Sequence, residues 1–143
     1  MAAGALVDAA DEDGRTALYV AAENGHVAVV QALLQAGANV DAARTTDFWT
    51  PLHIAAENGH VAVVKTLQGA GADTDAALTD GATPLHIAAW NFHTDVVAAL
   101  LEAGANANVV RTTDGVTPLF IAANDGHAVI AQSLLAADAK TVR

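Results

Sequence analysis

Histidine is the residue type in this chain that most readily binds a transition metal or transfers protons near neutral pH. The six histidines fall into two periodic sets, which are His26, His60, His93, His127 and His53, His86. Ring nitrogens that share a zinc ion must each approach it to about 2 Å. Successive members of each set are 33 or 34 residues apart in the sequence. If each stands on a different helix of a stack, neighbouring members are separated by roughly 8–10 Å. We therefore expect no metal site and no cofactor.

Nucleophilic chemistry has even less support. The chain has no cysteine, and its single serine, Ser133, lies inside a segment with helical spacing of apolar residues. The sequence contains no HExxH motif, no phosphate-binding Walker loop and no dinucleotide-binding glycine fingerprint. These observations predict that the protein is not an enzyme.

The histidines belong to a string that occurs four times. TPLHIAAENGH begins at Thr50, and variants begin at Thr16 (TALYVAAENGH), Thr83 (TPLHIAAWNFH) and Thr117 (TPLFIAANDGH). The steps between these threonines are 34, 33 and 34 residues, a period typical of stacked repeats. At this string the chain resembles the ankyrin-repeat family, from about residue 4 to 139. The resemblance implies one domain, 1–143, with repeats at about 4–37, 38–71, 72–104 and 105–139.

The chemistry of each repeat predicts the same fold. A threonine caps the first helix, and in three copies a proline follows at the first helical position. A glycine such as Gly59 then ends the helix in a left-handed conformation, and a second apolar helix follows. Asp-Gly pairs such as Asp80-Gly81 favour tight hairpins. We predict an all-α solenoid of helix-turn-helix units joined by β-hairpin loops. The family implies that both histidine sets bond to the backbone of neighbouring units.

Composition narrows the range of partners. The formal net charge is −10, which disfavours binding to phosphate backbones or to anionic membranes. No apolar run reaches the ~20 residues of a membrane span. The start of the chain has no signal-peptide pattern, and the absence of cysteine fits an intracellular protein. We expect a cytoplasmic protein with a protein partner, and neither nucleic acid nor membrane as a ligand.

Four of the six aromatic residues occupy two short segments. Phe48 and Trp49 precede the helix of the second copy, and Trp90 and Phe92 end the first helix of the third copy. In the family, hairpin tips and first helices form a concave face where partners bind. The resemblance therefore implies an aromatic binding patch on that face. Its predicted residues, including a polar rim, are Phe48, Trp49, Trp90, Phe92, Asp47, Glu57, Asn58 and Asn91.

The two phenylalanines also break the repeat pattern. Phe48 and Phe92 stand where the sister copies have glycine. If those glycines have positive φ, a phenylalanine there is disfavoured by about 1–2 kcal/mol. Residues that break a local rule often mark function. Two interpretations stay open, namely retention for binding and neutral drift of a loop.

Two functions follow from this pattern. The first is a non-catalytic interaction module, or scaffold, that binds one protein through the aromatic patch. The alternative is an assembly element that associates end to end, because no polar cap precedes Gly4. We expect a monomer with weak head-to-tail self-association. Natural and engineered origins both fit the sequence, and Asn108 matches an asparagine that is hydroxylated in some family members.

One helix is expected to be weaker than its sisters. In the second copy Gln68 replaces a leucine of the other copies, and Gly69 follows it. A polar amide at a core position and a glycine inside a helix both destabilise, the glycine by roughly 1 kcal/mol.

Overall fold

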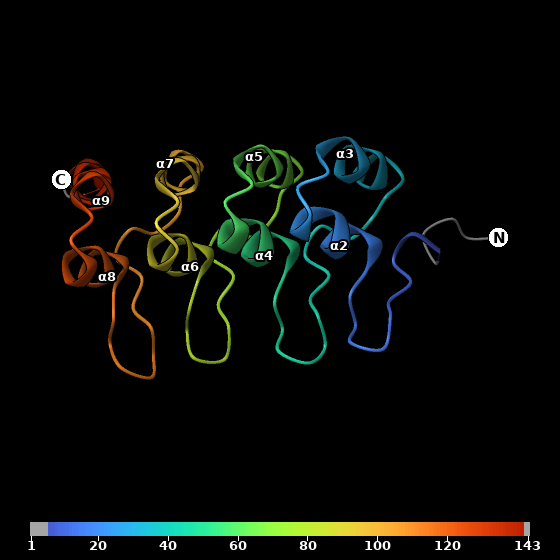
Figure 1. The fold of residues 1–143 in the computed structure, drawn as a ribbon, viewed down its shortest axis with the longest axis horizontal. Coiled ribbons are helices and arrows are strands. Elements are labelled where there is room, and N and C mark those ends of the chain that lie inside the picture. Colours follow the sequence, from blue (N-terminus) through green and yellow to red (C-terminus); the bar gives the residue numbers. More distant parts are fainter. Residues whose placement is uncertain (1–5, 142–143) are drawn as a thin grey trace.

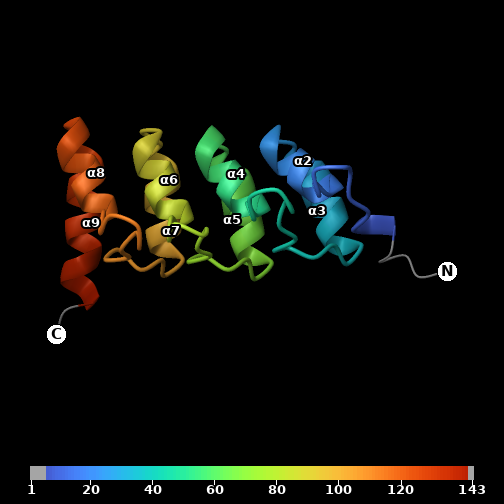
Figure 2. The ribbon, with the colours of Figure 1, turned by 90° about the horizontal axis from the view of Figure 1, so that it is seen from below.

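The structure is a computed structural model that describes residues 6–141, with side chains up to residue 138. Its helices form four consecutive pairs that stand side by side in one row (Figure 1). Loops between the pairs project to one side of the row, and the first and last pairs lie at its opposite ends (Figures 1 and 2). The pairs are α2 (Ala17–Glu23) with α3 (Val27–Gln35), α4 (Pro51–Asn58) with α5 (Val61–Gly69), α6 (Pro84–Trp90) with α7 (Thr94–Glu102), and α8 (Pro118–Asp125) with α9 (Ala128–Thr141).

This arrangement confirms the predicted all-α solenoid. The connecting loops have the expected hairpin shape and are closed by backbone hydrogen bonds, as between Arg44 N and Trp49 O at 2.7 Å. Within residues 6–141 the β-type pairing is limited to a single bridge between Ala10 and Thr16. The loops are therefore held by turns rather than by strand ladders.

The helix caps form as the sequence predicts. Thr50 Oγ1 accepts a hydrogen bond from His53 N at 3.3 Å, and Thr50 N donates to His53 Nδ1 at 3.1 Å. Pro51 then starts α4, and Gly59 ends it with φ 73°. Because Nδ1 accepts, the ring proton is on Nε2, which donates to Ala76 O of the next loop at 2.9 Å. This histidine therefore caps its own helix and joins two neighbouring units.

The same geometry recurs one unit later. His86 Nδ1 accepts from Thr83 N, and its Nε2 lies 2.9 Å from Val116 O. Both rings are buried, which lowers the pKa of His53 to about 4 and lowers the pKa of His86 in the same direction. These histidines are structural, as the family resemblance implies.

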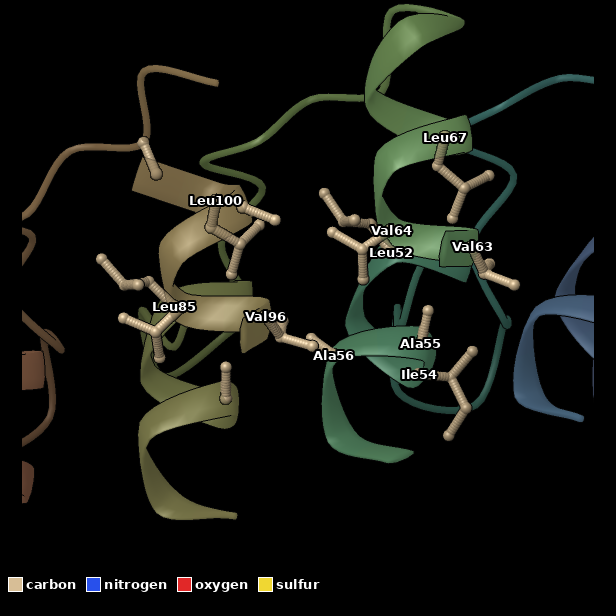
Figure 3. Close-up of a cluster of buried hydrophobic side chains, with 14 of the residues drawn as sticks. Leu52, Ile54, Ala55, Ala56, Val63, Val64, Leu67, Leu85, Val96 and Leu100 are labelled. Carbon is tan, nitrogen blue, oxygen red and sulfur yellow. The ribbon is translucent and has the colours of Figure 1, made fainter. Parts of the chain in front are cut away.

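The core is continuous along the row because each pair packs on the next. Leu52, Leu67, Leu85 and Leu100 are fully buried between the helix layers (Figure 3). Alanine pairs such as Ala55-Ala56 are also buried and let the first helices approach closely. Burial of each leucine contributes about 1.5–3 kcal/mol, so the stack depends on contacts between pairs as much as within them.

A second series of hydrogen bonds between units, which the sequence did not reveal, joins the loops that follow the second helix of each pair (the outer helices). In each case an aspartate side chain accepts from a backbone amide of the next unit, at 2.9–3.0 Å. The pairs are Asp8 with Asn39, Asp41 with Asp73, and Asp75 with Asn106. The Asn108 amide donates to the Asp138 carboxylate at 2.6 Å. Several of the acids are thus used to hold the stack.

The weak helix of the second copy needs a correction. Gly69 is the last residue of α5 rather than a mid-helix residue, so its destabilising effect is smaller than expected. Gln68 is only partly buried, as are Leu34 and Leu101 at the matching positions, so this position borders the core. Its Nε2 is nevertheless enclosed without a hydrogen-bond partner.

Candidate protein-binding surface

Phe48 lies in the loop before α4 with a strained backbone. Its φ is 66°, and 57 % of the residue is exposed. The matching glycines Gly14, Gly81 and Gly115 have φ of 74–86°. The left-handed conformation on which the expected strain depends is therefore present at Phe48, and the mostly exposed ring offsets only part of that strain.

The glycine at this position normally leaves room for a bond between successive loops. Thr45 N donates to Asp13 O at 3.2 Å, and Thr112 N donates to Asp80 O at 2.9 Å. A Cβ on Gly14 would lie 2.5 Å from Thr45 N. At the loop that carries Phe48, no described residue donates to Asp47 O. The link between this loop and the next one is missing.

Trp49 and Asp47 stabilise the same loop from within. Trp49 is half-buried against the core, with its ring centroid 5.8 Å from that of His53. Asp47 Oδ1 accepts from Trp49 N at 3.2 Å and from Arg44 Nε at 2.9 Å. The Arg44 hydrogen bond holds the pKa of Asp47 below its usual range. The Arg44 guanidinium also lies 5.3 Å from the ring centre of Tyr19, so Asp47 positions a cation over the preceding unit.

Trp90 meets the matching arginine of the last loop. The Arg111 guanidinium lies 4.6 Å from the Trp90 ring centre, and it pairs with Asp114 and, at 3.8 Å, with Asp80. An arginine that covers an aromatic ring of the preceding first helix thus occurs twice. The string RTTD, which occurs at 44–47 and again at 111–114, is the sequence signal of this shared arrangement. Beside Trp90 lies a groove of about 200 Å³, lined by Trp90, Arg111, Val116, Phe120, Ile121, Asn124 and Asp125.

Phe92 occupies the turn between α6 and α7. Its φ is 63°, 56 % of the residue is exposed, and its ring centroid lies 3.9 Å from that of His127. At the matching turn, a Cβ on Gly59 would lie 2.6 Å from the ring of His93. His93 there donates to Glu57 O at 2.8 Å, whereas His127 Nε2 is buried without a partner. Phe92 therefore stands where a bond between units is lost.

The predicted rim residues serve the fold through part of their polar groups. The Asn58 amide donates to Glu23 O at 3.0 Å, and the Asn91 amide donates to Ile87 O at 2.8 Å. The backbone oxygen of Glu57 accepts from His93, while its carboxylate forms no ion pair with any described residue. Of these three residues, Glu57 has the polar group that is freest to meet a ligand.

The predicted residues are spread over three levels of one face. Asp47, Phe48 and Trp49 lie in a loop, and Glu57 and Trp90 lie near the ends of first helices. Asn58 is the last residue of α4, and Asn91 and Phe92 lie in the turn after α6, so all three are at the other end of the first helices from the loops (Figure 2). The ring contacts of Trp49, Trp90 and Phe92 are with histidines and, for Trp90, also with an arginine, rather than with one another. The structure thus places the four aromatics at separate positions and not in one cluster of touching rings.

Comparison with known proteins gives the family. A model described as "Ankyrin repeats (3 copies)" matches residues 2–77 and 68–143. The chain belongs to the ankyrin-repeat family. No curated protein matches it. Ankyrin repeats are generally protein–protein interaction modules.

This ankyrin-repeat chain shows no arrangement suited to metal chemistry in the part that the structure describes. No group of three or more His, Asp or Glu side chains between residues 6 and 138 is placed to hold a metal ion. Each described helix is too short or too polar to cross a bilayer. The polar groups that converge are those of the caps and the bonds between units.

Proposed function

We propose that this ankyrin-repeat stack is a non-catalytic module that binds a protein across the face made by its loops and first helices. Phe48, Trp49, Trp90 and Phe92 serve as the anchors, with Glu57 and its polar neighbours as the rim. The observation that supports this proposal best is the state of the two phenylalanines. Both are more than half exposed, both have positive φ, and each stands where a bond between units is missing.

The energetics favour binding over drift. A left-handed backbone is disfavoured by about 1–2 kcal/mol at each phenylalanine. The exposed rings recover only part of that in burial, and the unbonded His127 adds to the loss. A partner that covers the rings would supply the missing burial, because truncation of a central aromatic anchor commonly weakens binding by 2 kcal/mol or more.

The test is affinity capture with matched variants. The wild type is compared with a Trp49→Ala/Trp90→Ala double variant, and with a Gln31→Ala/Lys65→Ala control on the outer helices. Gln31 and Lys65 are exposed on α3 and α5. We expect proteins that the wild type and the control retain and the tryptophan variant releases, with all three folded by circular dichroism. Equal retention by all three would contradict the proposal.

Titration of a captured protein then examines the phenylalanines. Phe48→Gly and Phe92→Gly each remove a ring while the backbone keeps a favoured conformation. We expect at least a tenfold loss of affinity in each, with non-additive losses where two anchors meet one pocket of the partner. Unchanged affinity would show that the phenylalanines are products of drift.

End-to-end assembly is a second candidate function, supported by the exposed faces of the row. Phe120 is 60 % exposed, whereas the matching Tyr19, His53 and His86 are at most 1 % exposed beneath the following unit. At the other end of the row Val29 is 49 % exposed, while residues at its position in later units are buried. The two faces resemble the halves of an internal interface, so a second copy could stack on either end.

Light scattering at two concentrations tests the assembly. We expect the average mass of the wild type to rise with concentration and that of Phe120→Asp to stay at the monomer value. Exposed Val129 on α9 provides a control, since Val129→Asp should leave the self-association unchanged. A wild type that stays monomeric at high concentration would exclude this function.

A further inference from the structure

The groove beside Trp90 is too small for a typical small-molecule ligand and suits one side chain. It measures about 200 Å³, below the roughly 300–1,000 Å³ of most ligand pockets. Its apolar lining comes from Trp90, Val116, Phe120 and Ile121. The Arg111 guanidinium already covers the Trp90 ring, so a second cation on that ring would be repelled. An aliphatic side chain fits this position best.

The charges around the groove are mostly negative once internal pairs are taken into account. Each described arginine is paired: Arg15 with Asp11, Arg44 with Asp47, and Arg111 with Asp114. The carboxylates of Glu57 and Asp125 form no ion pair with a described residue. The chain as a whole carries a net charge of −10. A partner with basic side chains complements this face.

Glu57, Trp90 and Asp125 lie on three successive first helices. Glu57 occupies in α4 the position that Trp90 occupies in α6, and Asp125 lies at the end of α8 and lines the groove. Adjacent first helices pack on one another along the row (Figure 1). Packed helices are roughly 8–10 Å apart. In an extended chain of the polyproline II type each residue rises about 3.1 Å and every third side chain points to the same side, whereas in a β-strand side chains three residues apart point to opposite faces. Three residues of an extended segment therefore span one unit.

We propose that the partner segment bound on this face is basic and extended in the polyproline II conformation, with an aliphatic side chain in the Trp90 groove. A lysine or arginine three residues to either side of it meets Glu57 and Asp125. This assignment rests on the proposed function and adds the chemistry and spacing of the ligand to it.

The test uses the peptide Arg-Gly-Ser-Leu-Gly-Ser-Arg and the ¹⁵N-labelled protein. The two tryptophans, Trp49 and Trp90, give separate indole N–H signals in a correlation spectrum. We expect the Trp90 signal to move with added peptide by more than the Trp49 signal. The Glu57→Gln/Asp125→Asn variant should bind the peptide at least fivefold more weakly. A peptide of the same composition with both arginines beside each other should also bind more weakly.

A charge-matched control separates a built surface from the overall charge. Asp95→Asn/Glu102→Gln changes the net charge equally on α7, an outer helix, and should leave the affinity within twofold of the wild type. Equal weakening by both double variants would overturn the inference, as would absence of any shift at Trp90.

The outcomes also separate this inference from the proposed function. A peptide with glutamate in place of arginine that moves the Trp90 signal equally would exclude a basic partner and leave the face as a binding surface. If no peptide moves that signal and the Trp49→Ala/Trp90→Ala variant still captures its proteins, both proposals fail.

Discussion

Two successive junctions of the stack differ at a single turn position. Between the second and third helix pairs, Gly59 leaves room for His93, which donates to Glu57 O at 2.8 Å. Between the third and fourth pairs, Phe92 replaces the glycine, and His127 Nε2 has no partner. The missing Cβ of one glycine thus determines whether a histidine can bond across the junction. Because each unit contacts only its neighbours, such a loss weakens one junction and leaves the rest intact.

We call the junction with Gly59 and His93 the sound junction, and the one with Phe92 and His127 the altered junction. The largest expected effect comes from giving the sound junction the phenylalanine of the altered one. Gly59→Phe places a Cβ 2.6 Å from the His93 ring and forces a non-glycine residue to φ near 73°. The strain of about 1–2 kcal/mol adds to the loss of a buried hydrogen bond, about 1–3 kcal/mol. We expect a destabilisation of roughly 3–4 kcal/mol, measured by urea unfolding.

Gly126→Phe is the matched control for that change. Gly126 has φ 75°, but a Cβ there meets nothing within 4 Å. This variant should show the strain alone, about 1–2 kcal/mol. Equal destabilisation by both variants would show that the histidine bond contributes nothing to the junction.

Many features of the two junctions could be predicted from the sequence, because alignment of the four repeats shows where one copy differs from the others. Four copies of one string predicted the solenoid and the threonine caps, and they marked Phe48 and Phe92 as residues that stand in place of glycine. Each of these depends on local backbone chemistry that one repeat contains. The family resemblance implied that both histidine sets bond to the neighbouring backbone, which holds for His60 and His93 but not for Nε2 of His127.

The features that sequence reasoning missed depend on contacts between units. The loss of the His127 bond follows from the Phe92 side chain acting on the next unit, at a distance no repeat-by-repeat comparison shows. The Arg111–Trp90 contact and the groove beside it arise from a loop of one unit folding over a helix of another. For the same reason the patch could be assigned to a face but not resolved into separate positions.

Low pH should weaken both junctions, because each contains a buried histidine that stabilises the fold only when its ring is neutral. His53 and His86 donate to Ala76 O and Val116 O across successive junctions. Burial lowers the pKa of His53 to about 4 from an ordinary 6.5, so below pH 6.5 the unfolded chain binds the proton first. The stabilisation is complete above pH 6.5 and is lost as the pH falls towards 4. We expect a loss of about 2 kcal/mol from His53 between pH 6.5 and 5.

Urea unfolding between pH 7.5 and 5 checks this dependence. His53→Tyr, which copies the buried Tyr19 of the first unit, should lower stability at neutral pH and flatten the slope below pH 6.5. An unaltered slope would mean that the pH dependence comes from other groups. The difference in stability between the two junctions should persist at each pH, because acid does not bring His127 Nε2 into hydrogen-bonding distance of a carbonyl oxygen.

Restoring the glycine at the altered junction should have a smaller effect of opposite sign. Phe92→Gly removes the backbone strain and lets His127 approach the Trp90 carbonyl as His93 approaches that of Glu57. The more flexible unfolded chain and the lost ring contact offset part of this gain. We expect a net stabilisation of about 1 kcal/mol in urea unfolding.

A double-mutant cycle identifies the source of that gain. His127→Ala should be nearly neutral in the wild type, where Nε2 lacks a partner, and should destabilise the Phe92→Gly protein by about 1 kcal/mol. Equal effects in both backgrounds would contradict the proposed role of His127. Slower amide exchange in α8 and α9 of Phe92→Gly would place the gain at this junction.

The smallest effect sharpens the comparison from the other side, at the edge of the sound junction. Gln68 in α5 occupies the position that Leu34 and Leu101 occupy in the neighbouring units. Its Nε2 is enclosed without a hydrogen-bond partner. Gln68→Leu removes the unsatisfied amide and adds apolar burial at a position that is only partly covered. We expect a gain of about 0.5–1 kcal/mol in urea unfolding, with slower amide exchange in α5. Lys65→Leu, at an exposed position of the same helix, should give no comparable gain. If both leucines stabilise equally, added hydrophobicity alone is the cause and the enclosed amide of Gln68 is not a weakness of the junction.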